Sequence, residues 1–254
     1  SDKYQKKTLQ AGELLYPEYL ERHLADLLEW KNLILREVYH AKGYTMDEMM
    51  AWLDQYGGAV KAHIQDTSRY LREAQKAGKS ILFEAQLGAL RDLDYGIYPY
   101  TTSSNAVAAF APVGSGLPSA RIDEVVGVVK AYSSCVGEGP FTCEWFGEEA
   151  EKLREAGAEY GAKTGRPRRV GPIDLVATRY GVETQAATAI ALTKLDVLSY
   201  LKEIPICAHY ELDGEITDDF PFPARLPDAK PVFETMPGWQ CDISAARTWE
   251  ELPQ

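Results

Sequence analysis

The sequence is poor in histidine and cysteine, and it lacks the patterns in which these residues hold metals. Only four histidines and four cysteines occur among its 254 residues. No two cysteines form a Cys-x-x-Cys pair, and no histidine lies at zinc-site spacing from one. We therefore expect no metal site within this sequence and free thiols in a reducing compartment. The cysteines are Cys135, Cys143, Cys207 and Cys241.

Long apolar runs and an excess of positive charge are also missing. No run approaches the roughly 18 apolar residues that are needed to span a bilayer. The formal net charge is -11, and this argues against nucleic acid as a partner because attraction to phosphates dominates such binding. Apolar residues make up 45% of the chain, which is ordinary for a globular protein. We expect a soluble, cytoplasmic protein with no membrane partner.

Residues 1–79 carry the periodicity of helices. Apolar residues recur at three- and four-residue steps after Pro17, a residue that suits a first helical turn. The motif TMDE at 45–48 is a capping box that predicts the start of a second helix, which we expect to end at Gly57-Gly58. A third helix is predicted from Val60 to Gly78. We interpret this stretch as a helical subdomain without chemistry of its own.

Residues 80–254 alternate between predicted strands and helices, which indicates an α/β fold with a mainly parallel central sheet flanked by helices. Buried strands are predicted at 81–83, 125–132, 189–192 and 206–210, and helices at 106–110, at 148–155 and from 173 onward. Asp213-Gly214 predicts a hairpin turn. The proline-rich stretch 221–237 is expected to be irregular.

The strongest concentration of positive charge is the segment GAKTGRPRRVG at 161–171. Three arginines and a lysine fall within seven residues of it. Its glycines and its proline predict an irregular loop. Arginine presents a planar fork that matches a carboxylate or a phosphate in two-point contact. The segment therefore suits a small anionic molecule, and the alternative is a solvated basic turn in acidic surroundings.

Three further loops follow predicted strands or precede predicted helices. YPYTTSSN at 98–105 offers hydroxyl groups at a predicted helix N-terminus, where they suit either a phosphate or an ordinary cap. VGEGPF at 136–141 is a glycine turn. TKLD at 193–196 ends a strand, and its carboxylate could accept hydrogen bonds from N1–H and the 2-amino group of guanine, a pair that adenine lacks. Alone, TKLD would suggest a GTP-dependent switch protein, but the other loops are not explained by that class.

Taken in order, these motifs resemble those of adenylosuccinate synthetase over nearly the whole chain. The matching blocks are FE at 83–84, DLDYG at 92–96, YPYTTSSN at 98–105, VVKAY at 128–132, VGEGPF at 136–141, TGRPRR at 164–169, LTKLDVL at 192–198 and PGW at 237–239. The resemblance implies a fold similar to that of P-loop NTPases and a homodimer. It implies an enzyme of purine biosynthesis that uses GTP and Mg²⁺ to phosphorylate O6 of inosine monophosphate (IMP). The L-aspartate amine then displaces that phosphate to give adenylosuccinate.

The resemblance also implies roles for particular residues. IMP would contact Lys6, Leu87, Thr102, Val136 and Arg166. The loop that closes on aspartate would consist of Ala162, Lys163, Thr164, Gly165, Arg166, Pro167 and Arg168. GTP would contact Arg168, Lys194, Leu195 and Asp196. Lys3 is the one candidate in this sequence for a catalytic role.

Four of the chain's residues depart from those usual in the family. Leu87 stands in place of a glutamine that touches IMP, and Lys6 and Cys135 stand in place of arginines. Lys6 keeps the charge but loses the bidentate fork. Lys163 replaces a threonine in the aspartate loop. These substitutions bear on substrate affinity and motivate an alternative, a non-catalytic relative that binds purine nucleotide or mediates dimerisation.

The family's glycine-rich phosphate loop has no counterpart that we find in this sequence. That loop carries the aspartate that acts as base and magnesium ligand, and the histidine that acts as general acid follows it. We expect these groups, the Mg²⁺ ligands and a final GTP-contacting segment to lie outside the sequence. Because arginines do not replace the N–H donors of such a loop, we expect little or no synthetase activity from this polypeptide alone.

Overall fold

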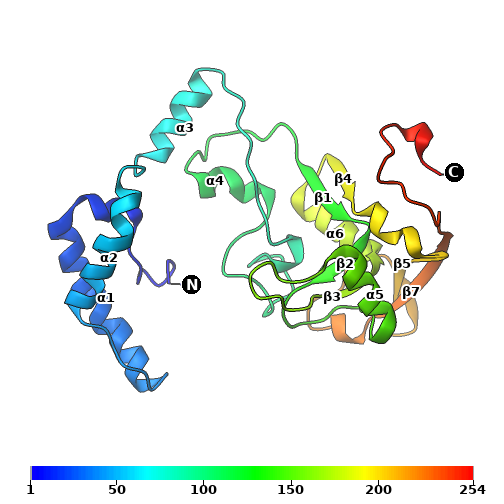
Figure 1. Cartoon of the computed structure of the whole chain (residues 1–254), viewed down its shortest axis with the longest axis horizontal. Coiled ribbons are helices and arrows are strands. Elements are labelled where there is room, and N and C mark those ends of the chain that lie inside the picture. Colours follow the sequence, from blue (N-terminus) through cyan, green and yellow to red (C-terminus); the bar gives the residue numbers. More distant parts are fainter. Residues whose placement is uncertain (1, 254) are drawn as a thin grey trace. The chain divides into compact units, whose positions relative to one another are not determined.

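The computed structural model describes residues 2–253, and it divides the chain into two compact units, Ser1–Ser80 and Ile81–Gln254. The first unit is helical (Figure 1). Its elements are η1 (Ala11–Leu15), α1 (Pro17–Glu37), α2 (Met46–Lys61) and α3 (Thr67–Lys76). Leu20, Leu24 and Leu53 form its core between α1 and α2. Among the described residues, no helix is both long enough and apolar enough to cross a membrane.

Two helix starts in the first unit agree with the local signals, whereas one predicted end and one predicted start are wrong. Pro17 opens α1, and Thr45 closes a capping box in which its hydroxyl accepts from the Glu48 N–H. Helix α2 does not end at Gly57-Gly58. The helix continues through both glycines, and Gly57 is buried against Leu14 of η1, where an added Cβ would make an ordinary contact at 3.4 Å. Helix α3 begins at Thr67 rather than Val60, because the Asp66 side chain caps it.

The second unit is an α/β structure, as predicted. In chain order it contains η2 (Ala89–Arg91), η3 (Ala108–Phe110), α4 (Ala111–Ser115), β1 (Val126–Lys130), β2 (Tyr132–Cys135), α5 (Gly147–Gly157), β3 (Arg169–Asp174), α6 (Leu175–Gln185), β4 (Ala189–Thr193), η4 (Leu195–Tyr200), β5 (Glu203–Leu212), β6 (Glu215–Thr217), η5 (Leu226–Asp228), β7 (Lys230–Pro237) and η6 (Trp249–Glu251). Helix α5 packs against β3, and α6 packs against β5 (Figure 1).

The strands pair in both directions. β1 pairs with β4 in parallel, and β3 pairs with β5 in parallel. β2 runs antiparallel to β3, while β6 and β7 both run antiparallel to β5. The five-stranded sheet has the order β2-β3-β5-β6, with β7 also on β5. The parallel pairs are joined through helices, and the antiparallel strands add a hairpin at Asp213-Gly214, where both residues have positive φ.

Three predicted stretches differ from the structure for reasons of pairing. Residues 81–83 form no strand, and Leu82 is 94% exposed, because no neighbouring strand among the described residues pairs with them. The predicted strand at 125–132 divides at Ala131, where the chain leaves β4 and joins β3. Residues 230–237 are not irregular but form β7, whose prolines are tolerated because β7 is an edge strand that pairs only with β5.

Two apolar clusters hold the second unit together. One packs Tyr132, Leu153, Val170 and Ile204 between α5 and the sheet, and the other packs Val176, Cys207 and Tyr210 beneath α6. All four cysteines are free thiols. Burial raises the pKa of the Cys207 thiol to about 12, so this group stays protonated and behaves as a small apolar side chain.

Candidate functional site

Arg91 joins two loops that are far apart in the sequence. It ends η2, and its guanidinium donates to the Tyr100 carbonyl and, at 3.2 Å, to the Glu138 carbonyl. The same group donates to the Val136 carbonyl at 3.2 Å and to Cys135 Sγ at 2.5 Å. The hydroxyl-rich residues 98–105 and the glycine turn at 136–141 are therefore held side by side. Sequence analysis did not identify Arg91, because only the folded chain shows these partners.

The main chain completes this junction at Thr102. The Thr102 N–H donates to the Arg91 carbonyl at 2.8 Å, and the Thr102 hydroxyl lies 3.3 Å from the Ser104 hydroxyl. Thr102 and Val136, both predicted to contact IMP, therefore both contact Arg91. Thr102 bonds to its main chain, and the Val136 carbonyl bonds to its guanidinium. Leu87, a third such residue, is 52% exposed with φ 79, and no described contact ties its side chain to this junction.

Arg169 clamps the glycine turn from the opposite side. Its guanidinium forms a bidentate ion pair with Glu144, at 2.8 and 2.5 Å, and donates to the Gly139 carbonyl at 2.8 Å. The Glu144 carboxylate raises the pKa of Arg169, so the clamp stays charged. Gly139 has φ 108, and a Cβ there would lie 2.7 Å from the Tyr100 ring, so only glycine lets the two loops approach. Sequence analysis placed Arg169 in a basic loop and missed this role.

A buried carboxylate shapes the chain before the hydroxyl-rich loop. Asp92 is fully buried and accepts hydrogen bonds from the N–H groups of Asp94, Tyr95, Ala106 and Val107. Burial alone would raise the pKa of Asp92, but these four donors outweigh it and lower the pKa. The ionised side chain therefore fixes both ends of the hydroxyl-rich segment.

The basic loop is shorter than predicted, because residues 169–171 belong to β3. Residues 161–168 form a compact turn, in which the Gly161 N–H donates to the Arg166 carbonyl at 2.8 Å and the Gly165 N–H donates to the Gly161 carbonyl at 2.8 Å. Arg166 is exposed, and no described residue accepts a hydrogen bond from its guanidinium. Arg166 is thus presented to solvent on a self-bonded turn, as a group that binds a small anion would be. The other exposed residues of the turn are Ala162, Lys163, Thr164, Gly165 and Pro167.

Arg168 turns inward instead, toward the residues that follow β4. These residues, Lys194, Leu195 and Asp196, are called the strand-end corner below. The Arg168 guanidinium donates to buried Glu159 at 2.9 Å, next to the C-terminus of α5. Lys194 reaches the same place, because its ammonium donates to the Gly157 carbonyl at 3.4 Å. Two residues predicted to contact GTP therefore converge from segments 26 positions apart in sequence numbering, 168 and 194.

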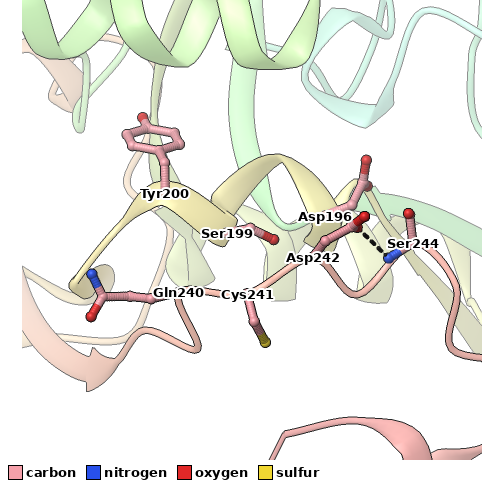
Figure 2. A pocket seen from close by; sticks show the side chains of 7 residues that line it. All are labelled: Asp196, Ser199, Tyr200, Gln240, Cys241, Asp242 and Ser244. Atoms are coloured by element: carbon pink, nitrogen blue, oxygen red, sulfur yellow. Dashed lines mark hydrogen bonds between the residues drawn. The ribbon is translucent and has the colours of Figure 1, made fainter.

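Asp196 lines an open cavity next to this corner. Lys194 has φ 63 and turns the chain out of β4, and Leu195 starts η4. The Asp196 carboxylate is exposed and lines a cavity of about 500 Å³, whose other lining residues are Ser199, Tyr200, Gln240, Cys241, Asp242 and Ser244 (Figure 2). The 240–244 segment is shaped by a 2.8 Å hydrogen bond from the Ser244 N–H to Asp242. Lys194, Leu195 and Asp196 also line a second cavity, of about 520 Å³, whose other walls include Ile243, Arg247 and Trp249.

Sequence analysis missed the segment 240–252 as part of this corner. The only signal near it was PGW at 237–239, of which Trp239 donates to the Ser199 hydroxyl at 3.0 Å and so fixes the segment on η4. Lys3 and Lys6 lie in the first unit, where both are exposed, so their approach to these loops stays a prediction. Within residues 2–253, no group of three or more His, Cys, Asp or Glu side chains is placed to hold a metal ion.

These features define an α/β protein whose exposed cationic loops and strand-end carboxylate are suited to an anionic, base-containing ligand. The chain belongs to the adenylosuccinate synthetase family, whose model matches residues 1–254. It is 43% identical over 253 residues to adenylosuccinate synthetase of a Thermoanaerobacter species, covering 99% of this chain and 59% of the relative. The enzyme of Bifidobacterium adolescentis is 43% identical over 255 residues, with 100% and 60% covered.

A solved structure gives the same fold. The fully ligated adenylosuccinate synthetase from Plasmodium falciparum superposes with a TM-score of 0.91 at 32% identity, covering 99% of this chain and 60% of that one. The resemblance predicted from the motifs is therefore confirmed at the level of family and fold. The chain spans about 60% of the length of the relatives that it matches.

Proposed function

We propose that this chain supplies the substrate-binding part of a GTP-dependent ligase that joins IMP and L-aspartate to form adenylosuccinate. The observation that carries this proposal is the convergence of the predicted substrate loops. Arg91 joins the Thr102 and Val136 segments, while Arg168 and Lys194 both reach the end of α5 beside the Asp196 corner. Family membership supports the reaction class.

The side chains suit the three substrates by their chemistry. The Thr102 hydroxyl suits the 5′-phosphate of IMP, whereas the nearby N–H groups of Ala106 and Val107 are already bonded to Asp92. Arg166, exposed on its compact turn, can bind the two oxygens of the aspartate carboxylate with one planar fork. Asp196 can accept from the N1–H and 2-amino groups of guanine, and this selects GTP over ATP. Two copies of the chain would form a homodimer, in which Lys6 of one copy would reach the IMP bound by the other.

The proposed reaction uses Mg²⁺, which would neutralise phosphate charge on GTP. The described residues do not fit this ion, because no cluster of acidic side chains among them is placed to hold it. We derive no step through the metal from these residues. Their part is to bind and orient IMP, aspartate and GTP.

The test uses the protein expressed from the complete gene that encodes this chain. With GTP, Mg²⁺, IMP and L-aspartate, it is expected to release phosphate and form adenylosuccinate, and omission of any substrate should stop the release. An Arg166→Leu variant should raise the KM for aspartate by about 100-fold, since a bidentate ion pair is lost. No phosphate release by the wild-type protein would reject the proposal.

A second candidate is a relative that binds purine nucleotide without turnover. It is favoured by Leu87, whose apolar and half-exposed side chain stands where the family's glutamine touches IMP. Calorimetry with IMP separates the two candidates. Tight binding of IMP by a protein that releases no phosphate would support this second function.

A further inference from the structure

Glu159 is a buried carboxylate for which the sequence suggested no role. It follows Ala158, whose φ of 52 ends α5, and its side chain is only 2% exposed. Its main chain is fixed on both sides, because its N–H donates to the Arg154 carbonyl at 2.8 Å and its carbonyl accepts from the Arg168 N–H at 2.9 Å. A charged group is rarely placed so deeply without a partner.

Three donors meet the Glu159 carboxylate. One oxygen accepts from the Lys130 ammonium at 2.6 Å and from the Tyr132 hydroxyl at 2.5 Å, and the other accepts from Arg168 Nη1 at 2.9 Å. Burial by itself would raise the pKa of Glu159, but these donors outweigh it and lower the pKa. Burial and the adjacent Glu159 charge raise the pKa of Tyr132, so its hydroxyl keeps the proton that it donates. Glu159 is therefore an ionised anchor for two cations.

Of the two cations, Arg168 has capacity left for a ligand. Its side chain is 32% exposed, and its Nη2 is neither buried nor hydrogen-bonded among the described residues, whereas its Nε is buried beyond the reach of a ligand. A guanidinium has five N–H donors, and Glu159 occupies only one side of the fork. The ion pair thus fixes the plane of Arg168 and leaves the Nη2 donors for an anion.

Glu159 also stands beside the corner that is proposed to hold guanine. Lys194 donates to the carbonyl of Gly157, two residues before Glu159, and the charge of Asp196 contributes to raising the pKa of Tyr132, a direct partner of Glu159. An anion that contacts Arg168 would therefore lie near the strand-end carboxylate that selects the base. The geometry fits a nucleoside triphosphate whose phosphates reach Arg168.

Resting on the proposed function, we propose that Glu159 is a positioning residue that orients Arg168 toward the phosphates of GTP. Glu159 acts through Arg168 and does not touch the substrate. The competing explanation is an ion pair that serves stability alone. The two explanations differ in whether the effect of losing Glu159 depends on the presence of Arg168.

The experiment is a double-mutant cycle in the protein expressed from the complete gene. Glu159→Gln keeps the shape and one acceptor oxygen but removes the charge. We expect it to raise the KM for GTP by at least 10-fold with a smaller change in kcat. Arg168→Ala should raise the same KM by at least as much. The double variant should be no worse than Arg168→Ala, because Glu159 has nothing left to orient. As a matched control, Glu211→Gln removes the 3.3 Å ion pair with Lys230 on β5 and β7 and should leave the KM unchanged.

Either of two results would overturn the proposal. The fold-changes of Glu159→Gln and Arg168→Ala could multiply in the double variant, or Glu159→Gln could lower the unfolding temperature without changing the KM. If the wild-type protein releases no phosphate, the proposed reaction fails, and the cycle is repeated with dissociation constants for GTP from calorimetry. Non-additive losses would then support the role of Glu159, and additive or absent losses would reject it.

Discussion

Asp92 shows how one carboxylate can hold a functional loop. Four N–H groups donate to a side chain with no exposed surface. We expect Asp92→Asn to lower the free energy of unfolding by about 2–4 kcal/mol. The reason is that one carboxylate oxygen becomes an NH2 group, and the buried N–H groups that donate to it lose their acceptor. Urea unfolding followed by circular dichroism measures the change. A loss below about 0.5 kcal/mol would show that the segment does not depend on this carboxylate.

The same residue predicts a dependence on pH. Because the folded state lowers the pKa of Asp92 below the ordinary value of 3.8, the carboxylate stabilises the fold fully above that value. The stabilisation is lost as the pH falls through the lower, folded pKa. The difference in unfolding free energy between wild type and Asp92→Asn should stay constant above about pH 5 and shrink below about pH 4. A difference that grows toward acid pH would contradict this.

In the proposed function, the choice of base depends on a single residue, Asp196. Asp196→Asn replaces an acceptor by a side chain that offers both an N–H and a carbonyl. We expect the KM for GTP to rise by about 100-fold, while xanthosine triphosphate, which carries a carbonyl in place of the 2-amino group, becomes the better nucleotide. Steady-state kinetics with both nucleotides measure the switch. Equal losses with both would place the base elsewhere.

At the scale of elements, local sequence signals predicted where helices start better than which segments pair as strands. The Thr45 capping box and Pro17 appear as predicted, because the atoms of a cap lie within one turn of the chain. The strand predicted at 81–83 failed and β7 was missed, since a strand depends on a partner that the local sequence does not reveal. The parallel pairing of β1 with β4 could be predicted, because both runs are apolar and the chain between them contains helices that can return it in the same direction.

β3 requires close approach at one position. A Cβ on Gly171 would lie 2.0 Å from the Cys143 carbonyl oxygen, which is main chain and cannot give way cheaply. We expect Gly171→Ala to destabilise the protein by about 3 kcal/mol or more. Gly127→Ala is the matched control in β1, because its Cβ would make ordinary contacts, with the Ala187 side chain at 3.4 Å and the Ala189 carbonyl oxygen at 3.7 Å. Thermal unfolding compares the two, and equal midpoints would contradict the prediction.

At the scale of the whole molecule, each unit has apolar clusters of its own. The cluster around Leu20 and Leu24 lies within Ser1–Ser80, while the clusters around Leu153 and Tyr210 lie within Ile81–Gln254. We expect residues 81–254, expressed alone, to give near-ultraviolet circular dichroism and one cooperative thermal transition. A flat near-ultraviolet spectrum would show that this part needs the helical unit to fold.

The candidate site was predictable in its exposed loops and not in its supports. Arg166, Lys194 and Asp196 stand in short motifs whose residue types reveal their chemistry. Arg91 and Glu159 each have a partner far along the chain, Glu138 at 47 positions and Tyr132 at 27 positions, and no local pattern marks such contacts. The residues proposed to bind were named from the sequence and stay a prediction, whereas those that hold them in place required the fold.

The pairing of β1 with β4 has a practical consequence. Each strand pairs only with the other within residues 2–253, and Val128 and Ile190 are 74% and 52% exposed on them. Uncovered apolar strands with free edges add further strands from neighbouring molecules. We expect the purified 254-residue chain to scatter more light as its concentration rises, and Val128→Lys to suppress this. The chain would then have to be stored at low concentration for its folding and binding to be measured.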